Sequence, residues 1–392
     1  MLNTPFFPWP SFTQEEADAV SRVLLSNKVN YWTGTESREF EKEFAEYCGT
    51  EHAIALANGT LALDLALHAL GIGTGDEVVV TPRTFLASAS SIVNSGAKPV
   101  FAEVDRDSQN ITADTIAAVL TEHTKAIICV HLAGLPCDMD PIMALSEKNN
   151  LFVIEDCAQA HGAKYKGRPV GSIGHIGAWS FCQDKIMTTG GEGGMVTTND
   201  EVLWKAMWSF KDHGKCYDSV YNTEHPRGFR WLHNEFGTNW RITEMQSAIG
   251  RIQLRRMPEW TRKRQANAAA ITEVCRTITA LRIPEVPESI EHACYKHYVF
   301  VRPEMLKEGW SRDRIVDEIN GSGVPCYQGS CSEIYLEKAF DHSGFRPEER
   351  LPIARELGDT SLMFLVHPTL TQDEISKTCE VVQEVMGEAV DR

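Results

Sequence analysis

Lys185 lies in a polar loop that ends in a run of glycine residues. The loop reads SFCQDKIMTTGGEGG over residues 180–194, and Glu192 interrupts its final glycines. Glycine lets a backbone approach a ligand closely. A lysine in a partly dry pocket can lose its proton and act as a nucleophile or form a Schiff base. Taken alone, such a residue is more commonly a solvated loop lysine. The loop is not a P-loop, because G-x-x-x-x-G-K-[ST] is absent.

Asp156 ends the apolar run LFVIED of residues 151–156. In open parallel sheets, ligands bind beyond the carboxyl ends of the strands. A carboxylate at this position would therefore point into a ligand crevice. The alternative of equal weight is an aspartate that caps a following helix.

Asn58, Gly59 and Thr60 open a helical pattern with leucines on one face. The free amides at the start of such a helix, together with the Thr60 hydroxyl, would form an anion site. A plain Asn cap is the commoner interpretation of this tripeptide by itself.

These three features together match the requirements of pyridoxal 5'-phosphate (PLP). The helix start would hold the phosphate, and Lys185 would form the Schiff base. Asp156 would keep the pyridine nitrogen protonated, so that the ring acts as an electron sink. Phe85 could stack on the ring, although an ordinary core position is its alternative.

The surrounding segments predict an α/β fold. Short apolar runs at 77–81, 98–104, 126–132 and 151–156 are typical of buried strands, and helical patterns at 112–122 and 140–149 separate them. This alternation indicates a mainly parallel sheet covered by helices on both faces.

After residue 250 the pattern changes. We expect a long helix broken at Pro258, a loop over 283–291, a strand over 295–301, and helices over 311–321 and 371–390. These segments predict a smaller C-terminal α+β domain. The predicted division is a large domain over residues 1–250 and a small domain over 251–392.

Composition narrows the class of protein. The 392 residues carry 38 basic and 54 acidic side chains, a net charge of −16, and 43% are hydrophobic. The acidic balance argues against nucleic-acid binding, and the apolar runs are too short to cross a membrane. The start of the chain lacks the basic region of a signal peptide, and eleven scattered cysteines suit a reducing compartment. We therefore expect a cytoplasmic protein.

The chain resembles the DegT/DnrJ/EryC1/StrS family of PLP-dependent nucleotide-sugar aminotransferases. The resemblance runs almost from end to end through ANGTLAL, TPRTFLASA, VIEDCAQAHGA, GAWSFCQDKIMTTGGEGG and GTNWRITEMQSAIGRIQL. It implies the aspartate aminotransferase fold (PLP fold type I), with a mostly parallel central sheet in the large domain.

The resemblance also implies roles for individual residues. Lys185 would be the catalytic lysine that binds the cofactor and moves the proton. Asp156 would pair with the pyridine nitrogen, Gln159 would lie beside the ring hydroxyl, and Phe85 would stack on the ring. The expected phosphate ligands are Gly59, Thr60, Ser180 and, from the neighbouring subunit, Asn239. Arg241 would support the same region or the substrate.

The implied reaction is transfer of an amino group from L-glutamate to a nucleotide-linked keto sugar, for amino-sugar and surface-glycan (lipopolysaccharide O-antigen) biosynthesis. We expect the C4 ketone of a UDP-2-acetamido-2,6-dideoxy-4-keto hexose, and a homodimer with shared active sites. Two alternatives stay open, a PLP-dependent sugar dehydratase and a non-catalytic protein of the same fold. The retained Lys185 argues against the first, and complete Lys185, Asp156 and Gln159 argue against the second.

Two further clusters require a functional interpretation. His131, Cys137, Asp138 and Asp140 fit no usual zinc or calcium spacing, so we expect no metal site. The basic run over residues 251–264 is typical of a solvated or subunit-facing helix surface. One departure from the family is an extra glycine between Lys185 and Glu192, which affects loop detail.

Overall fold

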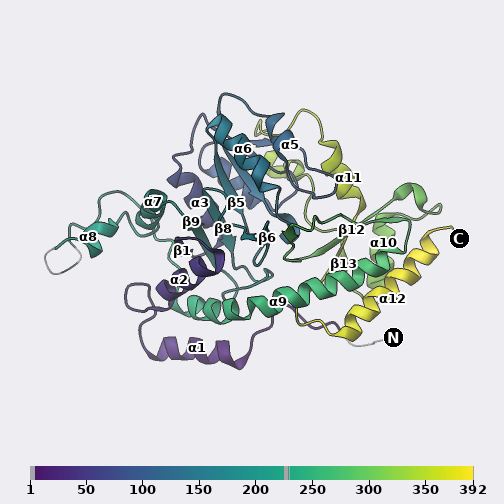
Figure 1. The fold of residues 1–392 in the computed structure, drawn as a ribbon, viewed down its shortest axis with the longest axis horizontal. Helices are drawn as coiled ribbons and strands as arrows, with labels where there is room; N and C mark the ends of the chain where they lie inside the picture. The colour runs from purple at the N-terminus through teal and green to yellow at the C-terminus, as the bar shows by residue number, and fades with distance from the viewer. Residues whose placement is uncertain (1–4, 225–227, 229, 392) are drawn as a thin grey trace.

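The computed structural model describes residues 5–224, 228 and 230–391, and its strands form three sheets (Figure 1). The strands are β1 (His52–Leu56), β2 (Glu77–Val80), β3 (Lys98–Phe101), β4 (Thr124–Val130), β5 (Phe152–Asp156), β6 (Lys164–Tyr165), β7 (Arg168–Pro169), β8 (Ile176–Ser180), β9 (Gly194–Thr198), β10 (Leu281–Arg282), β11 (Ile290–Glu291), β12 (His297–Val301), β13 (Cys326–Tyr327) and β14 (Ser361–Phe364). The helices are α1 (Gln14–Leu25), α2 (Glu36–Cys48), α3 (Gly59–Ala69), α4 (Ala87–Asn94), α5 (Ala113–Ala117), α6 (Met139–Asn149), α7 (Glu201–Lys211), α8 (Tyr217–Tyr221), α9 (Glu244–Arg276), α10 (Arg312–Gly321), α11 (Pro352–Thr360) and α12 (Gln372–Ala389).

The central sheet has seven strands in the order β1-β9-β8-β5-β4-β2-β3. Strands β8, β5, β4, β2 and β3 are parallel to one another, while β9 runs antiparallel to β8 and β1. The predicted mostly parallel sheet is therefore confirmed, and the four apolar runs predicted as strands form β2, β3, β4 and β5. Because the parallel strands end at one edge, the loops that follow them meet there.

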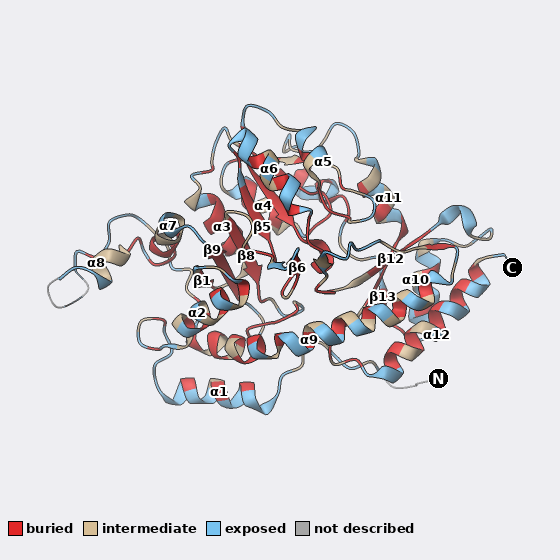
Figure 2. Ribbon diagram, in the orientation of Figure 1, coloured by how far each residue is buried: buried red, intermediate tan, exposed pale blue. Residues whose placement is uncertain are grey.

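Helices cover both faces of this sheet, which explains why most residues of its strands are buried (Figure 2). Val78, Val80 and Ile128 pack in one core with residues of α3, α4 and α7. Val79 and Ile127 point to the opposite face and pack with residues of α5 and α6. Because side chains alternate between the two faces of a strand, each strand contributes residues to two separate cores.

A second sheet, in the order β10-β12-β14-β13, carries the C-terminal part of the chain. Its antiparallel strands pack with α10, α12 and the end of α9 around Ile315, Phe364 and Val382. The strand expected over 295–301 and the helices expected over 311–321 and 371–390 are confirmed as β12, α10 and α12. The segment 283–291 is a loop as expected, except that β11 occupies its last two residues.

The predicted break at Pro258 is wrong, because α9 continues through it from Glu244 to Arg276. Pro258 is exposed, and α9 packs against α1, α2 and α12 (Figure 1). Tertiary packing here outweighs the local cost of proline. Residue 250 lies within α9, so the domain division at 250/251 stays a prediction.

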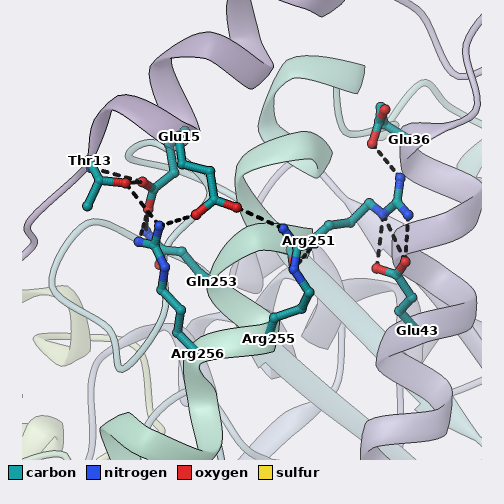
Figure 3. Close-up of polar contacts among 9 residues, drawn as sticks. Thr13, Glu15, Glu36, Glu43, Arg251, Gln253, Arg255 and Arg256 are labelled. Carbon is teal, nitrogen blue, oxygen red and sulfur yellow. Dashed lines mark hydrogen bonds and ion pairs between the residues drawn. The ribbon is translucent and has the colours of Figure 1, made fainter.

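The basic run on α9 is directed mainly toward its own chain (Figure 3). Arg251 donates to Glu36 and Glu43 of α2, and Arg256 donates to Glu15 and Glu16 of α1. The hydrogen bond from Arg256 holds the pKa of Glu15 below its usual range. Both side chains are paired within the chain and partly exposed, and a subunit-facing role for this surface stays a prediction.

The rest of the basic run divides between solvent and core. Arg255, Arg262 and Lys263 are exposed, as expected, whereas Arg264 is buried. None of the helices in the described part of the chain combines the length and apolar character needed to cross a membrane.

Candidate active site

A cleft of about 1030 Å³ lies at the carboxyl edge of the central sheet. The residues after β1, β2, β5 and β8 line one side, and residues near β12, β13 and β14 line the other. The N-terminal segment Phe6–Trp9 forms a further wall. Of the predicted site residues, the structure brings seven together in this cleft: Gly59, Thr60, Phe85, Asp156, Gln159, Ser180 and Lys185.

Asp156 is the last residue of β5, and its buried carboxylate is held by two donors. Ser88 Oγ donates to Oδ2 at 2.8 Å, and the Ala158 amide donates to Oδ1 at 3.1 Å. Turns follow Asp156 in place of a helix, so the helix-cap alternative is wrong. The carboxylate is fixed in one orientation at the base of the cleft.

Thr84 and Ser88 extend this arrangement, and sequence analysis missed both. Thr84 Oγ1 and Ser88 Oγ lie 2.9 Å apart, and both residues line the cleft. Thr84 follows β2 and Ser88 lies in the first turn of α4, so the loop after β2 places two hydroxyls beside the carboxylate of β5. The available signal was a pair of hydroxyl residues four apart, directly after a buried strand.

Gln159 is oriented by the backbone of a neighbouring loop. Its Oε1 accepts a hydrogen bond of 2.8 Å from the amide of Ala133, a residue with φ of 57°. Because Oε1 already accepts this hydrogen bond, the Nε2 amide nitrogen is left to donate within the cleft.

The start of α3 forms a close-packed cradle. Asn58 Oδ1 accepts from the Leu61 amide at 2.9 Å and caps the helix. This leaves the Gly59 and Thr60 amides at the helix N-terminus, next to Ser180. A Cβ on Gly59 would lie 2.5 Å from Ser180 Cβ, so only glycine fits. Eleven residues of helix stand behind these amides, and their dipole favours an anion at this end.

Lys185 is half-buried in the cleft, which excludes the alternative of a freely solvated loop lysine. Its carbonyl accepts a hydrogen bond of 2.8 Å from Trp9 Nε1, and its ammonium lies 5.3 Å from the centre of the Tyr295 ring. In the loop that follows, Gly190 and Gly191 have φ of 89° and 125°. Both positions therefore require glycine.

Phe85 lines the cleft with 70% of its surface exposed. Its alternative as an ordinary core residue is therefore wrong. A large apolar ring exposed at the cleft offers a flat surface to a bound ring.

Asn239 and Arg241 do not line this cleft. Asn239 is exposed and forms an isolated bridge with Asp212. Arg241 Nη1 donates to Asp212 Oδ1 at 2.6 Å, and Lys215 donates to the same oxygen. Arg241 thus anchors the segment that carries Asn239. The contact of Asn239 with a neighbouring subunit stays a prediction.

Three basic residues, Lys296, Arg264 and His367, lie in or next to the cleft and have pKa values lowered by burial. Burial lowers the pKa of Lys296 to about 8, against the opposing charge of Asp184. Burial also lowers the pKa of Arg264 to about 10. His367 is kept neutral, with a pKa lowered to about 3 by burial, Arg264 and Lys296. Sequence analysis missed Lys296, whose only signal was its place beside the strand at 297–301.

The candidate metal residues from the sequence have separate partners. His131 Nδ1 accepts from the Cys137 amide, Asp138 accepts from Tyr165, and Asp140 binds Lys166. In the described chain, His131 does lie near Glu155 and Cys157, with ligand atoms within 4.8 Å of one another.

Hydrogen bonds within the protein already satisfy that group. Glu155 accepts from His131 Nε2 at 3.0 Å and from the amides of Gly171, Ile173 and Gly174. We interpret the cluster as a buried hydrogen-bond network with a structural role at the ends of the central strands.

The mostly parallel sheet and the cleft with its lysine, aspartate and helix N-terminus define a PLP-dependent aminotransferase of fold type I. The chain belongs to the DegT/DnrJ/EryC1/StrS aminotransferase family, whose model matches residues 10–383.

Known proteins narrow the class further. The chain is 34% identical over 379 residues to a GDP-perosamine synthase of Escherichia coli O157:H7, covering 96% of each chain. It is 34% identical to a UDP-N-acetyl-3-dehydro-alpha-D-glucosamine 3-aminotransferase of Acidithiobacillus ferrooxidans, covering 94% of this chain and 92% of that one. The X-ray structure of an aminotransferase from Psychrobacter cryohalolentis matches at 66% identity and a TM-score of 0.97, covering 98% and 99%. The chain is a sugar aminotransferase.

Proposed function

We propose that this enzyme transfers the amino group of L-glutamate to the C4 ketone of a UDP-2-acetamido-2,6-dideoxy-4-keto hexose. The observation that carries the reaction class is the convergence of Lys185, Asp156 and the α3 N-terminus on one cleft. The cleft volume of about 1030 Å³ is at the upper end for a small-molecule site and suits a nucleotide-linked sugar.

The residues present fit PLP. The cradle at Gly59, which admits no Cβ, would hold the phosphate with the amides of Gly59 and Thr60 and the Ser180 hydroxyl. Asp156 would pair with the pyridine nitrogen. When bound, PLP supplies an electron sink for the electron pair left on a substrate carbon that loses its proton.

The protein's own contribution is proton transfer, orientation and exclusion of water. Lys185 would remove the proton from the donor carbon in the first half-reaction and deliver a proton to the sugar carbon in the second, which is general acid–base catalysis worth roughly 10²–10⁴-fold. Phe85 would stack on the ring, and Gln159 would lie beside the ring hydroxyl. The N-terminal segment, fixed by the bond from Trp9 to Lys185, would limit access of water.

The nucleotide and the carbon position are the finest part of the proposal. The relatives include enzymes named for GDP- and UDP-linked sugars, so the choice of UDP requires a direct test. Purified enzyme should aminate the UDP-4-keto sugar in preference to its dTDP- and GDP-linked counterparts. Turnover restricted to a dTDP or GDP sugar would contradict this part alone.

Assembly as a homodimer would complete the site. Asn239 is exposed and forms a bridge with Asp212 at the end of α7, and we propose that it reaches the phosphate of the partner subunit. All eleven cysteines are free thiols, which supports the cytoplasm as the compartment. The amino sugar that the proposed reaction yields would serve surface-glycan biosynthesis.

The experiment that tests the proposal is the absorbance spectrum of the holoenzyme before and after addition of L-glutamate. The visible band of the bound cofactor should bleach in the wild type and be absent or unresponsive in Lys185→Ala. A band that persists with glutamate removes it as donor. Release of a ketone without amine would favour a dehydratase instead.

A further inference from the structure

Lys296 is a second lysine in the cleft, and both Lys296 and Lys185 lie near the ring of Tyr295. The Lys296 ammonium lies 4.8 Å from the Tyr295 ring centre, and the Lys185 ammonium lies 5.3 Å from it. These distances limit the separation of the two nitrogens to about 10 Å. Lys296 is half-buried and lines the same cleft.

The positive charge around Lys296 lacks a matching partner. Arg264 is 1% exposed, and its Nε and Nη2 have no hydrogen-bond partner within the described chain. Its other contacts are a long bond of 3.4 Å to the Tyr295 carbonyl and the face of the Trp9 ring. Among the ion pairs of the described residues, none includes Lys296 or Arg264.

Asp184 is the carboxylate that influences Lys296, but it is shared. It accepts a hydrogen bond from Tyr295 and also faces Lys185. Buried charges are normally paired, so in a chain of net charge −16 this local excess of cations marks a place where a ligand supplies the anion.

We propose that Lys296, backed by Arg264, binds a carboxylate of the amino donor. The donor must place its amino group at Lys185, and a short dicarboxylic amino acid is long enough to reach Lys296 from there. The diphosphate of the sugar substrate is also an anion, so it is the alternative ligand for Lys296. The closeness of Lys296 to Lys185 favours the smaller ligand. The inference rests on the proposed function only in requiring an anionic donor.

The first test measures the two half-reactions separately in Lys296→Met and Lys296→Arg holoenzymes. For Lys296→Met we expect the apparent dissociation constant of L-glutamate to rise about 10- to 100-fold, with little change in the limiting rate of bleaching. Lys296→Arg should recover most of the affinity. The sugar half-reaction should change less than threefold, and Lys148→Met, an exposed lysine on α6, should match the wild type throughout.

The second test does not depend on turnover. Calorimetric titration of the holoenzyme with glutarate, a dicarboxylate without an amine, should show binding in the wild type and at least tenfold weaker binding in Lys296→Met. Equal glutarate affinity in both, or no binding by the wild type, would overturn the inference. A defect confined to the sugar half-reaction would assign Lys296 to the diphosphate and also overturn it. If glutamate fails to bleach the wild type while glutarate binding still requires Lys296, the proposed function fails and this site stands.

Discussion

Ser88 Oγ donates a hydrogen bond of 2.8 Å to Asp156 Oδ2, although the two residues lie 68 positions apart on α4 and β5. The bond joins the loop after one parallel strand to the end of another. It leaves the carboxylate with a single orientation, which is what a partner for a ring nitrogen needs.

Replacing Ser88 with alanine should therefore reduce the rate of the glutamate half-reaction about 5- to 50-fold, because one buried hydrogen bond to a charged group is lost. Ser90→Ala on the same helix provides the matched control and should have no effect. Asp156→Ala should reduce the rate far more than Ser88→Ala. Equal rates for Ser88→Ala and the wild type would show that Asp156 does not depend on Ser88.

Gly59 should not tolerate a side chain. In Gly59→Ala the new Cβ would lie 2.5 Å from Ser180 Cβ, so the start of α3 must move away from the phosphate position. We expect the equilibrium dissociation constant of PLP to rise at least tenfold in fluorescence titrations.

Gly387→Ala is the control for this substitution. Gly387 lies in α12 with nothing within 4 Å of its added Cβ. This variant should keep wild-type cofactor affinity and gain about 0.5–1 kcal/mol in free energy of unfolding. Unchanged PLP binding in Gly59→Ala would contradict the cradle.

Glu155 should make the stability of the protein depend on pH in the acid range. Burial raises its pKa, but hydrogen bonds from His131 and from the Gly171 and Gly174 amides outweigh burial, so the folded-state pKa is lowered. Because the folded state favours the carboxylate, this stabilisation is present above the unfolded pKa, near 4.5, and is lost as pH falls through the lower folded value.

Glu155→Gln should weaken this dependence and cost about 1–3 kcal/mol at neutral pH. The free energy of unfolding, measured by denaturant titration between pH 3 and 7, checks both effects. Glu122→Gln, at an exposed glutamate, should reproduce the wild-type curve. A Glu155→Gln curve as steep as that of the wild type would assign the acid sensitivity to other groups.

Pro258→Ala should stabilise the protein. Pro258 lies inside α9, where it removes one helical hydrogen bond, and it is exposed, so its ring contributes little to the core. Alanine restores the bond at the cost of a more flexible unfolded chain, for an expected gain of about 2 kcal/mol in the free energy of unfolding. A loss of stability would mean that α9 requires the proline geometry.

Much of the candidate site could be predicted from the sequence because it depends on local signals. Asp156 follows an apolar run, Gly59 and Thr60 follow a capping asparagine, and Lys185 precedes a glycine-rich loop. Each is recognisable within about ten residues of chain. The parallel strands were predictable for the same reason, since an apolar run marks a strand buried on both faces.

Residues that act through distant partners were not predictable. Ser88 and Lys296 have ordinary local sequences. The role of Ser88 is recognisable only from its contact with Asp156, and that of Lys296 only from its position near Tyr295 and Arg264. Packing on α1 and α2, which are distant in the sequence, keeps α9 helical through Pro258. The same two helices supply the carboxylates that pair with Arg251 and Arg256 (Figure 3).

Local sequence patterns determined the class of fold and the candidate reactive groups, because strand periodicity, helix caps and glycine loops act over short range, and the resemblance of motifs along the chain indicated the family. Only the tertiary structure decided which groups meet in the cleft, which charges are left without partners, and which face of α9 is buried. Those properties follow from burial and from distances between elements, which a linear sequence does not contain.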